Sequence, residues 1–220
     1  MADGRPNVLW ICTDQQRFDT IAALGNDHIR TPNIDRLVAE GVAFRRCYSQ
    51  SPICTPSRAC FLTGCYPSTL HVNRNGNEYF PCPEKLITRM LSDSGYDCGL
   101  SGKLHLSAAN RRVERRFGDG YRFYKWSHHP YPEDYWPNEH HDYQRWLAEK
   151  GFDWSGHYGP REGIVCRGVP AEHHQTTWCA SEAIAFMSER RDGPWLMSVN
   201  PFDPHPPFDP PPDYMERMDV

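Results

Sequence analysis

The sequence lacks several features that would place it in a specialised class of protein. It has no apolar run of 18 residues, so no segment predicts a membrane-spanning helix, and we expect no membrane partner. None of its nine cysteines forms a Cys-x2-Cys pair, which argues against structural zinc, and their odd number and irregular spacing argue against a disulfide framework. It has no long Lys or Arg run and a formal charge of -4, so we expect no nucleic-acid partner.

The composition is that of a folded globular chain. Of the 220 residues, 39% are apolar, 24% are charged and 13% are aromatic, while 20 prolines indicate many loops. Residues 1–6 show no basic segment followed by a long apolar one, so the chain is expected to be cytoplasmic.

Strand and helix signals alternate along the chain and predict an α/β fold. Apolar runs rich in β-branched or aromatic residues predict buried strands at 7–12, about 42–48, 96–101 and 195–200. Capping signals and apolar periodicity predict helices at 32–40, 56–63, about 83–94 and about 176–190. Between about 110 and 175 no periodicity is evident, so this segment is interpreted as an irregular insertion.

Polar side chains follow the predicted strands at the edge where α/β sheets bind ligands. Asp14 follows the first strand, and Lys103 and His105 follow the strand at 96–101. Cys54 lies just before the helix at 56–63, where free backbone N-H groups favour an anion.

The residues around Cys54 match a known motif. Cys54-Thr55-Pro56-Ser57-Arg58, followed by Leu62-Thr63-Gly64, matches the signature C-x-P-S-R-x-x-x-L-T-G of the sulfatases. Further stretches match the same family in the same order: 7–9 with Asp14-Gln15, 31–37, 41–44, 102–106 and 204–208. The chain therefore resembles the formylglycine-dependent sulfatases of the alkaline phosphatase superfamily, close to the group of phosphonate monoester hydrolases and arylsulfatases.

The resemblance implies an architecture. An alkaline-phosphatase-like mixed sheet flanked by helices is expected, with residues 1–220 forming the N-terminal portion of the catalytic domain and the insertion at about 110–175 interrupting it. Sulfatases are about twice this length, in the range where chains divide into domains. The fold and the metal site are therefore expected to be incomplete because the C-terminal part is absent, and the fragment alone is expected to be inactive.

The resemblance also implies a nucleophile and a metal. A maturation enzyme would convert Cys54 to formylglycine, whose hydrate attacks sulfur, and Arg58 would steady the nucleophile. Asp14, Gln15 and the modified Cys54 would hold a divalent cation, with Ca²⁺ favoured over Mg²⁺ or Mn²⁺. Many sulfatases have two acidic residues where this chain has Asp14-Gln15, so its site loses one negative charge.

Four further residues are assigned by the same resemblance. Lys103 and His205 would bind the sulfate and stabilise or protonate the leaving oxygen, and His105 would act as the base that releases sulfate. Asn75 matches a substrate-binding asparagine of some relatives, although Asn75-Gly76 is equally typical of a simple turn.

The expected substrate is a small-molecule or saccharide sulfate ester. Hydrolysis of a phosphonate monoester or phosphodiester by the same nucleophile is the alternative that Asp14-Gln15 favours, whereas Lys103-x-His105 favours sulfate. A non-catalytic homologue with an unmodified Cys54 also remains open, as does assembly into a homo-oligomer.

Overall fold

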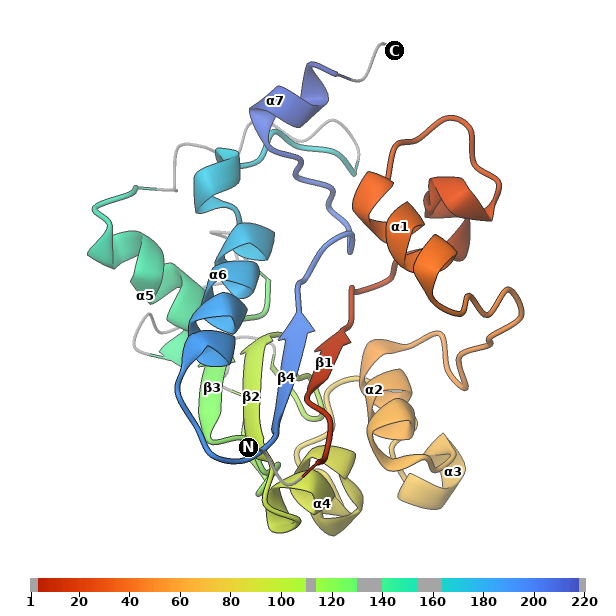
Figure 1. Cartoon of the computed structure of the whole chain (residues 1–220), viewed down its shortest axis with the longest axis vertical. Helices are drawn as coiled ribbons and strands as arrows, with labels where there is room; N and C mark the ends of the chain where they lie inside the picture. Colours follow the sequence, from red (N-terminus) through yellow and green to blue (C-terminus); the bar gives the residue numbers. More distant parts are fainter. Residues whose placement is uncertain (1–3, 110–113, 130–139, 154–163, 218–220) are drawn as a thin grey trace.

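A parallel β-sheet forms the centre of the protein. The computed structural model describes residues 4–109, 114–129, 140–153 and 164–217. Its sheet has the order β1-β4-β2-β3, with strands β1 (Val8–Ile11), β2 (Asp97–Gly102), β3 (Phe123–Trp126) and β4 (Trp195–Asn200) (Figure 1). Because all pairs among these strands are parallel, their carboxyl ends share one edge.

Helices lie on both faces of the sheet and beyond its edge. They are α1 (Pro32–Glu40), α2 (Cys54–Thr63), α3 (Pro67–Leu70), α4 (Ile87–Asp93), α5 (Asp142–Glu149), α6 (Gln175–Ser188) and α7 (Pro212–Met215). Short 3-10 helices occupy Phe18–Thr20, Ala22–Leu24, Pro83–Lys85 and Ala171–His173. Within the described residues, no helix has the length and apolar character needed to cross a bilayer.

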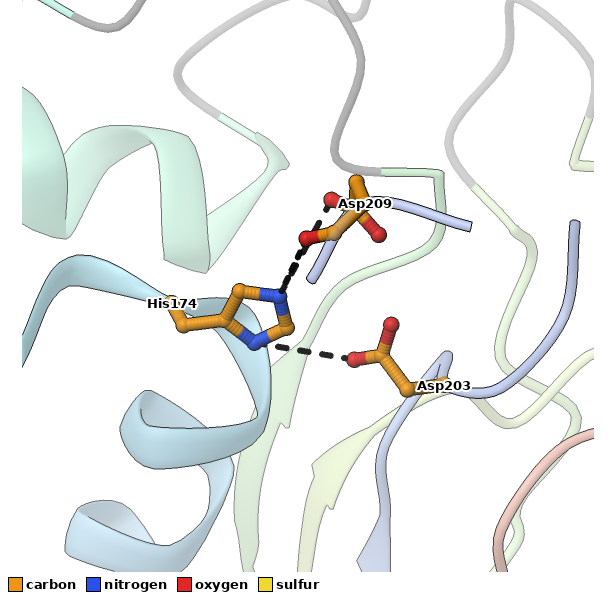
Figure 2. Close-up of side chains that lie close together, drawn as sticks. All are labelled: His174, Asp203 and Asp209. Atoms are coloured by element: carbon orange, nitrogen blue, oxygen red, sulfur yellow. Dashed lines mark hydrogen bonds and ion pairs between the residues drawn. The ribbon is translucent and has the colours of Figure 1, made fainter. Parts of the chain in front are cut away.

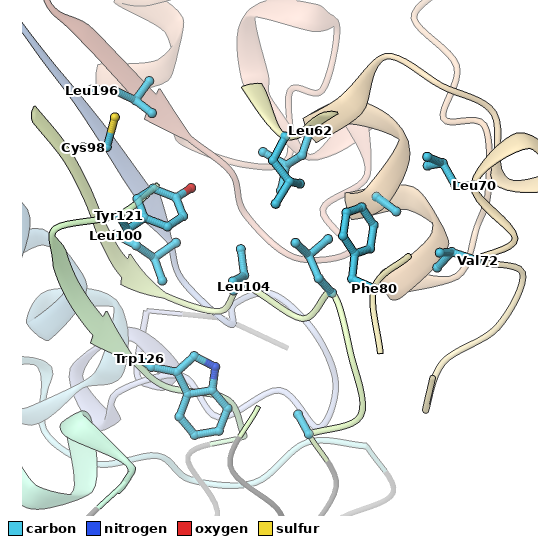
Figure 3. Packing of buried hydrophobic residues seen from close by; sticks show 14 residues of the cluster. Leu62, Leu70, Val72, Phe80, Cys98, Leu100, Leu104, Tyr121, Trp126 and Leu196 are labelled. Atoms are coloured by element: carbon cyan, nitrogen blue, oxygen red, sulfur yellow. The ribbon is translucent and has the colours of Figure 1, made fainter. Parts of the chain in front are cut away.

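The two faces of the sheet bury separate hydrophobic clusters, as expected from the two-residue period of a strand. On one face Leu100 of β2 and Leu196 of β4 pack with residues from α2 and α3, including Leu62 and Leu70 (Figure 3). On the other face Met197 and Val199 of β4 pack with α5 and α6 through Tyr143, Leu147, Trp178, Cys179, Ala183 and Phe186. The predicted α/β class, with helices flanking a sheet, is confirmed.

The first strand is not buried as the sequence predicted. β1 lies at the edge of the sheet and pairs only with β4, and Leu9 and Ile11 are 47% and 60% exposed. Val8 packs partly against the core, and Trp10 stacks on Phe61 of α2 with ring centroids 5.5 Å apart but stays 37% exposed. An apolar sequence predicts burial, but burial depends on elements that cover the strand, and the described part of the chain provides them on one side.

The strand predicted at about 42–48 is also wrong. These residues form turns and extended backbone outside the sheet, and Val42, Phe44 and Tyr48 are 77% to 80% exposed. A strand needs a neighbour to satisfy its backbone hydrogen bonds, and no described strand lies alongside this segment.

Two other predictions needed revision. The helix expected at about 83–94 is divided, because Leu86 is extended between the 3-10 helix Pro83–Lys85 and α4. The segment at about 110–175, expected to be irregular, contains β3 and α5. Four-residue β3 is Phe-Tyr-Lys-Trp, in which polar and apolar residues do not alternate, so its pattern gave no strand signal. The remainder of that segment at 110–113, 130–139 and 154–163 lies outside the described residues.

Gly102 controls the approach of β2 to β4 next to the predicted site. Its φ is 103°, and a Cβ at this position would lie 2.0 Å from the carbonyl oxygen of Asn200. The absence of a side chain lets the N-H of Lys103 donate to that same carbonyl at 2.8 Å. Position 102, immediately before Lys103, therefore requires glycine.

Replacing Gly102 with alanine is expected to lower the free energy of unfolding by about 3 kcal/mol or more, because a steric clash adds to an unfavourable φ. Gly151→Ala is the matched control: φ is 67° there, but nothing lies within 4 Å of the added Cβ. The control should cost about 1–2 kcal/mol. Urea unfolding followed by circular dichroism measures both, and equal costs would contradict the close approach.

Candidate active site

Predicted site residues from distant parts of the sequence meet at the carboxyl edge of the sheet. Asp14 follows β1, Lys103 follows β2, and the segment 201–205 follows β4, while Cys54 opens α2 beside β1. The N-H of Asp14 donates to the carbonyl of Asp203 at 3.2 Å, which joins the segments after β1 and β4. This convergence follows from the parallel strand order, because every strand delivers its next residues to one edge.

A buried carboxylate lies between two cations at the centre of the site. Asp14 Oδ2 accepts a hydrogen bond from Lys103 Nζ and lies 3.7 Å from Arg58 Nη2. All three side chains are buried, and Lys103 is only 1% exposed. Burial by itself would raise the pKa of Asp14, but the charges of Lys103 and Arg58 outweigh it and hold that pKa below its ordinary value. The carboxylate is therefore anionic, whereas burial lowers the pKa of Lys103 and the charge of Asp14 acts against that shift.

Arg58 is fixed in place by the end of β2. Its Nη1 donates to the carbonyl of Lys103 at 2.7 Å, and Asn200 Nδ2 donates to the same carbonyl at 2.9 Å. A side chain from α2 is thus held by backbone that belongs to the sheet. The guanidinium of Arg58 is therefore held in a fixed position on the helix that begins at Cys54.

Cys54 is the first residue of α2 and lies against Asp14. Its Sγ is 3.9 Å from Asp14 Oδ1, whereas Lys103 and Arg58 contact Oδ2. The two oxygens of one carboxylate thus face different partners. The predicted helix at 56–63 begins two residues earlier than expected, at Cys54 itself.

Asn75 contacts the start of the same helix. Its Oδ1 accepts a hydrogen bond from the N-H of Thr55 at 2.9 Å, so it satisfies one of the free donors in the first turn of α2. Thr55 is the residue after Cys54. The contact is compatible with Asn75 as a substrate-binding residue and with Asn75 as part of a simple turn. Gln15 follows Asp14 with a φ of 59° and an exposed side chain.

His105 is held by a buried carboxylate that the sequence did not reveal. The N-H of His105 donates to Glu114 Oε2 at 2.7 Å, and Trp126 Nε1 donates to the same oxygen at 3.0 Å. The strained backbone of His105, with a φ of 57°, depends on this anchor. Glu114 stands between pairs of arginines, at 111–112 and 115–116, so its neighbours suggested a solvated surface.

The imidazole of His105 is neutral. Burial, followed by the charges of Lys103 and Arg58, lowers its pKa to about 2. The ring packs edge-on against that of His128 with centroids 4.6 Å apart, and its Nδ1 has no hydrogen-bond partner in the described part of the chain. A neutral ring has a free lone pair, but a pKa of about 2 makes it a weak base, so the predicted role requires an anionic substrate to offset the charges of Lys103 and Arg58.

His205 lies on the loop after β4 and contacts aromatic residues. Its Nδ1 is 2.7 Å from the carbonyl of Pro206, which can only accept, so Nδ1 carries the proton and Nε2 is an acceptor. Its ring lies 4.5 Å from that of Phe202 and 5.7 Å from that of His129. His129, which the sequence did not single out as a site residue, therefore borders the site.

The cation that the sulfatase resemblance implies needs hard oxygen ligands, and the site partly meets this need. Asp14 is anionic, and its Oδ1 faces the position of Cys54 Sγ, which an oxygen of the formylglycine hydrate would take. Asp14 and the modified Cys54 thus fit a divalent cation. Gln15 is adjacent in sequence, and its side chain is exposed.

Cys54 begins a helix beside a buried carboxylate and two basic side chains, at the carboxyl edge of a parallel sheet. These features define an α/β protein with a nucleophile site next to basic residues. The sulfatase family model matches residues 6–220. The chain therefore belongs to the sulfatase family.

Individual relatives agree with this assignment. The chain is 30% identical over 220 residues to the uncharacterized sulfatase YidJ of Escherichia coli K12, covering 97% of the chain and 41% of YidJ. It is 29% identical over 151 residues to an N-acetylglucosamine-6-O-sulfatase of Bacteroides thetaiotaomicron, covering 67% of the chain and 25% of that protein.

A solved structure matches in the same way. The phosphonate monoester hydrolase of Agrobacterium radiobacter superposes with a TM-score of 0.72 at 28% identity, covering 96% of the chain and 44% of that protein. The chain therefore spans less than half the length of these relatives, and it is a partial sulfatase domain.

The buried neutral state of His105 should make the protein sensitive to mild acid. Its folded pKa of about 2 lies below the ordinary 6.5, so the unfolded chain binds an extra proton between these values. The stabilising contribution is complete above pH 6.5 and is lost as the pH falls towards 2, at about 1.4 kcal/mol per pH unit. His105→Gln should reduce the slope of unfolding free energy against pH by that amount between pH 6 and 4.

Chemical denaturation at a series of pH values measures this slope. At pH 8 the imidazole is neutral in both states, so the difference there reports only lost packing and serves as the internal control. Parallel curves for the two proteins down to pH 4 would show that His105 is not buried in its neutral form.

Proposed function

We propose that this chain forms the nucleophile-bearing part of an enzyme that hydrolyses sulfate monoesters through formylglycine derived from Cys54. The observation that supports this most directly is the contact of Cys54 Sγ with Asp14 Oδ1 at 3.9 Å, at the start of α2 and next to Arg58 and Lys103. A sulfate ester is anionic and repels an anionic nucleophile, so cations and backbone donors are needed around the attacking atom.

The proposed reaction proceeds in two steps with a balanced exchange of protons. One hydroxyl of the formylglycine hydrate would release its proton to water and attack sulfur, the S–O bond of the ester would break, and the alcohol oxygen would gain a proton from Lys103 or from protonated His205, which water then reprotonates. His105 then removes the proton of the second hydroxyl, the aldehyde re-forms, and sulfate is expelled. Water rehydrates the aldehyde, so the net reaction consumes one ester and one water.

The side chains of this chain suit those roles. His105 presents a neutral ring with a free lone pair, and half-buried His205 can stabilise the leaving oxygen only after its acceptor atom Nε2 has taken up a proton. Arg58 is held at a fixed point by the Lys103 carbonyl, so it can direct N-H groups at the nucleophile without paying for reorganisation. Asn75 and Lys103 are the proposed contacts to the sulfate group.

Asp14, Gln15 and the modified Cys54 are the proposed ligands of a divalent cation, with Ca²⁺ favoured over Mg²⁺ or Mn²⁺. The cation would supply Lewis-acid stabilisation of negative charge on the nucleophile and the sulfate oxygens. Because the chain covers only 41% of YidJ, we expect the 220 residues alone to have an incomplete metal site and to be inactive.

The proposed partners are a formylglycine-generating maturation enzyme, which would act on Cys54, and a substrate of the sulfate ester class. A saccharide sulfate is the substrate we favour, since one relative is an N-acetylglucosamine-6-O-sulfatase. The leaving group itself would be recognised by residues outside the nucleophile site.

Maturation of Cys54 can be tested without any substrate. Conversion of the thiol to formylglycine should lower the mass of the peptide that contains Cys54 by about 18 Da in protein produced by the native host. Mass spectrometry of that peptide measures the shift, with the peptide containing exposed Cys47 as the unmodified control. In a complete enzyme that contains these 220 residues, produced in the same host, Cys54→Ala should lower turnover at least about 10³-fold, whereas Cys47→Ser should not change it.

An unmodified Cys54 in native protein, together with full turnover by the Cys54→Ala variant, would exclude formylglycine chemistry. An unmodified Cys54 without any turnover would favour a non-catalytic homologue.

Hydrolysis of a phosphonate monoester or phosphodiester is a second candidate, because the phosphonate monoester hydrolase of A. radiobacter has the same fold at 28% identity. Lys103 and His105 favour sulfate, and Asp14-Gln15 favours the alternative. We expect kcat/KM for 4-nitrophenyl sulfate to exceed that for phenyl phosphonate at least about tenfold, a difference of about 1.4 kcal/mol in transition-state stabilisation. The reverse order, measured on one preparation of native protein, would assign the phosphonate reaction.

A further inference from the structure

Glu114 is a buried carboxylate whose hydrogen bonds go to the backbone that follows β2. It is 2% exposed, and its two oxygens accept from the N-H groups of three consecutive residues, His105 at 2.7 Å, Leu106 at 2.5 Å and Ser107 at 3.3 Å. The indole Nε1 of Trp126 donates to the same carboxylate at 3.0 Å. Successive backbone N-H groups that converge on an anion form a recurrent concave motif, and here a side chain of the same chain fills it.

The partners of Glu114 indicate that it is held as an anion. All four are N-H donors, two to each oxygen, so a protonated carboxyl group would find no acceptor among them for its own O-H. Burial raises the pKa of Glu114, and the hydrogen bonds from the backbone and from Trp126 act against that rise. Hydrogen bonds to an ionised acceptor are stronger than neutral ones, so this carboxylate is a firm anchor for the backbone.

The backbone that Glu114 holds is strained at the residue proposed as the base. His105 has a φ of 57°, and a non-glycine residue in this left-handed region persists only where its surroundings determine the conformation. The ring of His105 contributes little to that determination, because its Nδ1 has no hydrogen-bond partner in the described part of the chain. The ring is placed by its backbone and by edge-on packing against His128, with centroids 4.6 Å apart.

Glu114 also joins the segment after β2 to the neighbouring strand. Trp126 is the last residue of β3 and pairs with Gly102, the last residue of β2. The carboxylate therefore links the chain beyond one strand to a side chain at the end of the next. A shift of His105 away from the carboxyl edge of the sheet would break several of these bonds together.

The loop that bears His205 is supported by other residues. Figure 2 shows the imidazole of His174 between two carboxylates, with Nδ1 3.7 Å from Asp203 Oδ2 and Nε2 3.9 Å from Asp209 Oδ2. These contacts join the loop after β4 to the residue that caps α6. None of them involves Glu114, so a change at Glu114 should leave His205 in place.

We propose that Glu114 is the positioning residue of His105: it fixes the backbone at residues 105–107 and thereby the point at which the imidazole meets the second hydroxyl of the nucleophile. The proposal rests on the proposed function, in which His105 is the base that releases sulfate. Glu114 contacts N-H groups and not the imidazole nitrogens, so it transfers no proton and acts only through the position of His105.

Glu114→Gln tests this role in a complete enzyme that contains these 220 residues. The amide has the same shape but points an NH₂ group at N-H donors, so part of the anchor is lost. A misplaced base slows the release of sulfate and not the attack on sulfur. With 4-nitrophenyl sulfate, kcat and KM should therefore fall together by at least about tenfold while kcat/KM changes less than about twofold. A burst of 4-nitrophenol larger than that of the wild type should precede the steady rate.

Asp119→Asn is the matched control for a loss of stability. Asp119 is 1% exposed, accepts from the N-H of Tyr121 at 3.0 Å and pairs with Arg116, so it is a buried backbone anchor outside the site. Its replacement should lower the free energy of unfolding but leave kcat and the burst unchanged. Equal losses of kcat in the two variants, or a loss in kcat/KM as large as that in kcat, would overturn the proposal. Should Glu114→Gln fail to fold, Glu114→Asp, which keeps the charge on a shorter side chain, takes its place.

Nuclear magnetic resonance of the 220-residue chain tests the position of His105 without any turnover. The ring of His128 should shift the imidazole signals of His105, and Glu114→Gln should move them towards those of an exposed histidine while the signals of His205 stay unchanged. Hydrogen exchange of the N-H groups at 105–107 should become at least about tenfold faster in that variant.

Rapid exchange of these N-H groups in the wild type, or unchanged His105 signals in the variant, would overturn the proposal even if the enzyme is active. Protected N-H groups and shifted His105 signals, in a complete wild-type enzyme that turns over no sulfate ester, would instead refute the proposed function and leave the anchor of His105 standing.

Discussion

The buried pair of Asp14 and Lys103 is the interaction on which the rest of the site depends. Each residue follows a different strand, and the pair forms only if β1 and β2 both flank β4 in register. A buried ion pair adds little net stability, but loss of one partner leaves the other charge buried and uncompensated. The contact therefore acts mainly as a constraint on geometry: it holds the ends of two strands and, through Arg58, the start of α2 in one arrangement.

Backbone features next to this pair serve the same constraint. Gly102 allows β2 to approach β4 immediately before Lys103, and the carbonyl of Lys103 then accepts from both Arg58 and Asn200. Glu114 fixes the chain just beyond, where it bonds to the N-H of His105. The chemical groups of the site are thus positioned by main-chain contacts in the sheet and its loops, which is how a nucleophile site can be preorganised before any substrate arrives.

Sequence signals such as helix caps and apolar runs correctly predicted the elements α1 and β4. The N-terminal proline and following glycine bounded α1, and the apolar run at 195–200 matched β4 in every residue. The cluster of Asp14, Cys54, Arg58 and Lys103 was also foreseen, because the sulfatase motifs and the edge rule for parallel sheets both placed it there. Burial of β1 and the strand at 42–48 were predicted wrongly, since these depend on neighbours that no local pattern specifies.

Glu114 and His129 illustrate the other kind of failure. Glu114 lies in a basic stretch, where a solvated carboxylate is the ordinary expectation, yet it is fully buried by contacts with backbone N-H groups and Trp126. His129 borders the site through rings that lie far away in the sequence, Phe202 and His205. Tertiary contacts alone create both roles. The exposed apolar residues of β1 also depend on tertiary contacts, because an apolar strand is buried only when other elements cover it. The chain is a partial sulfatase domain, and its described elements cover β1 on one side.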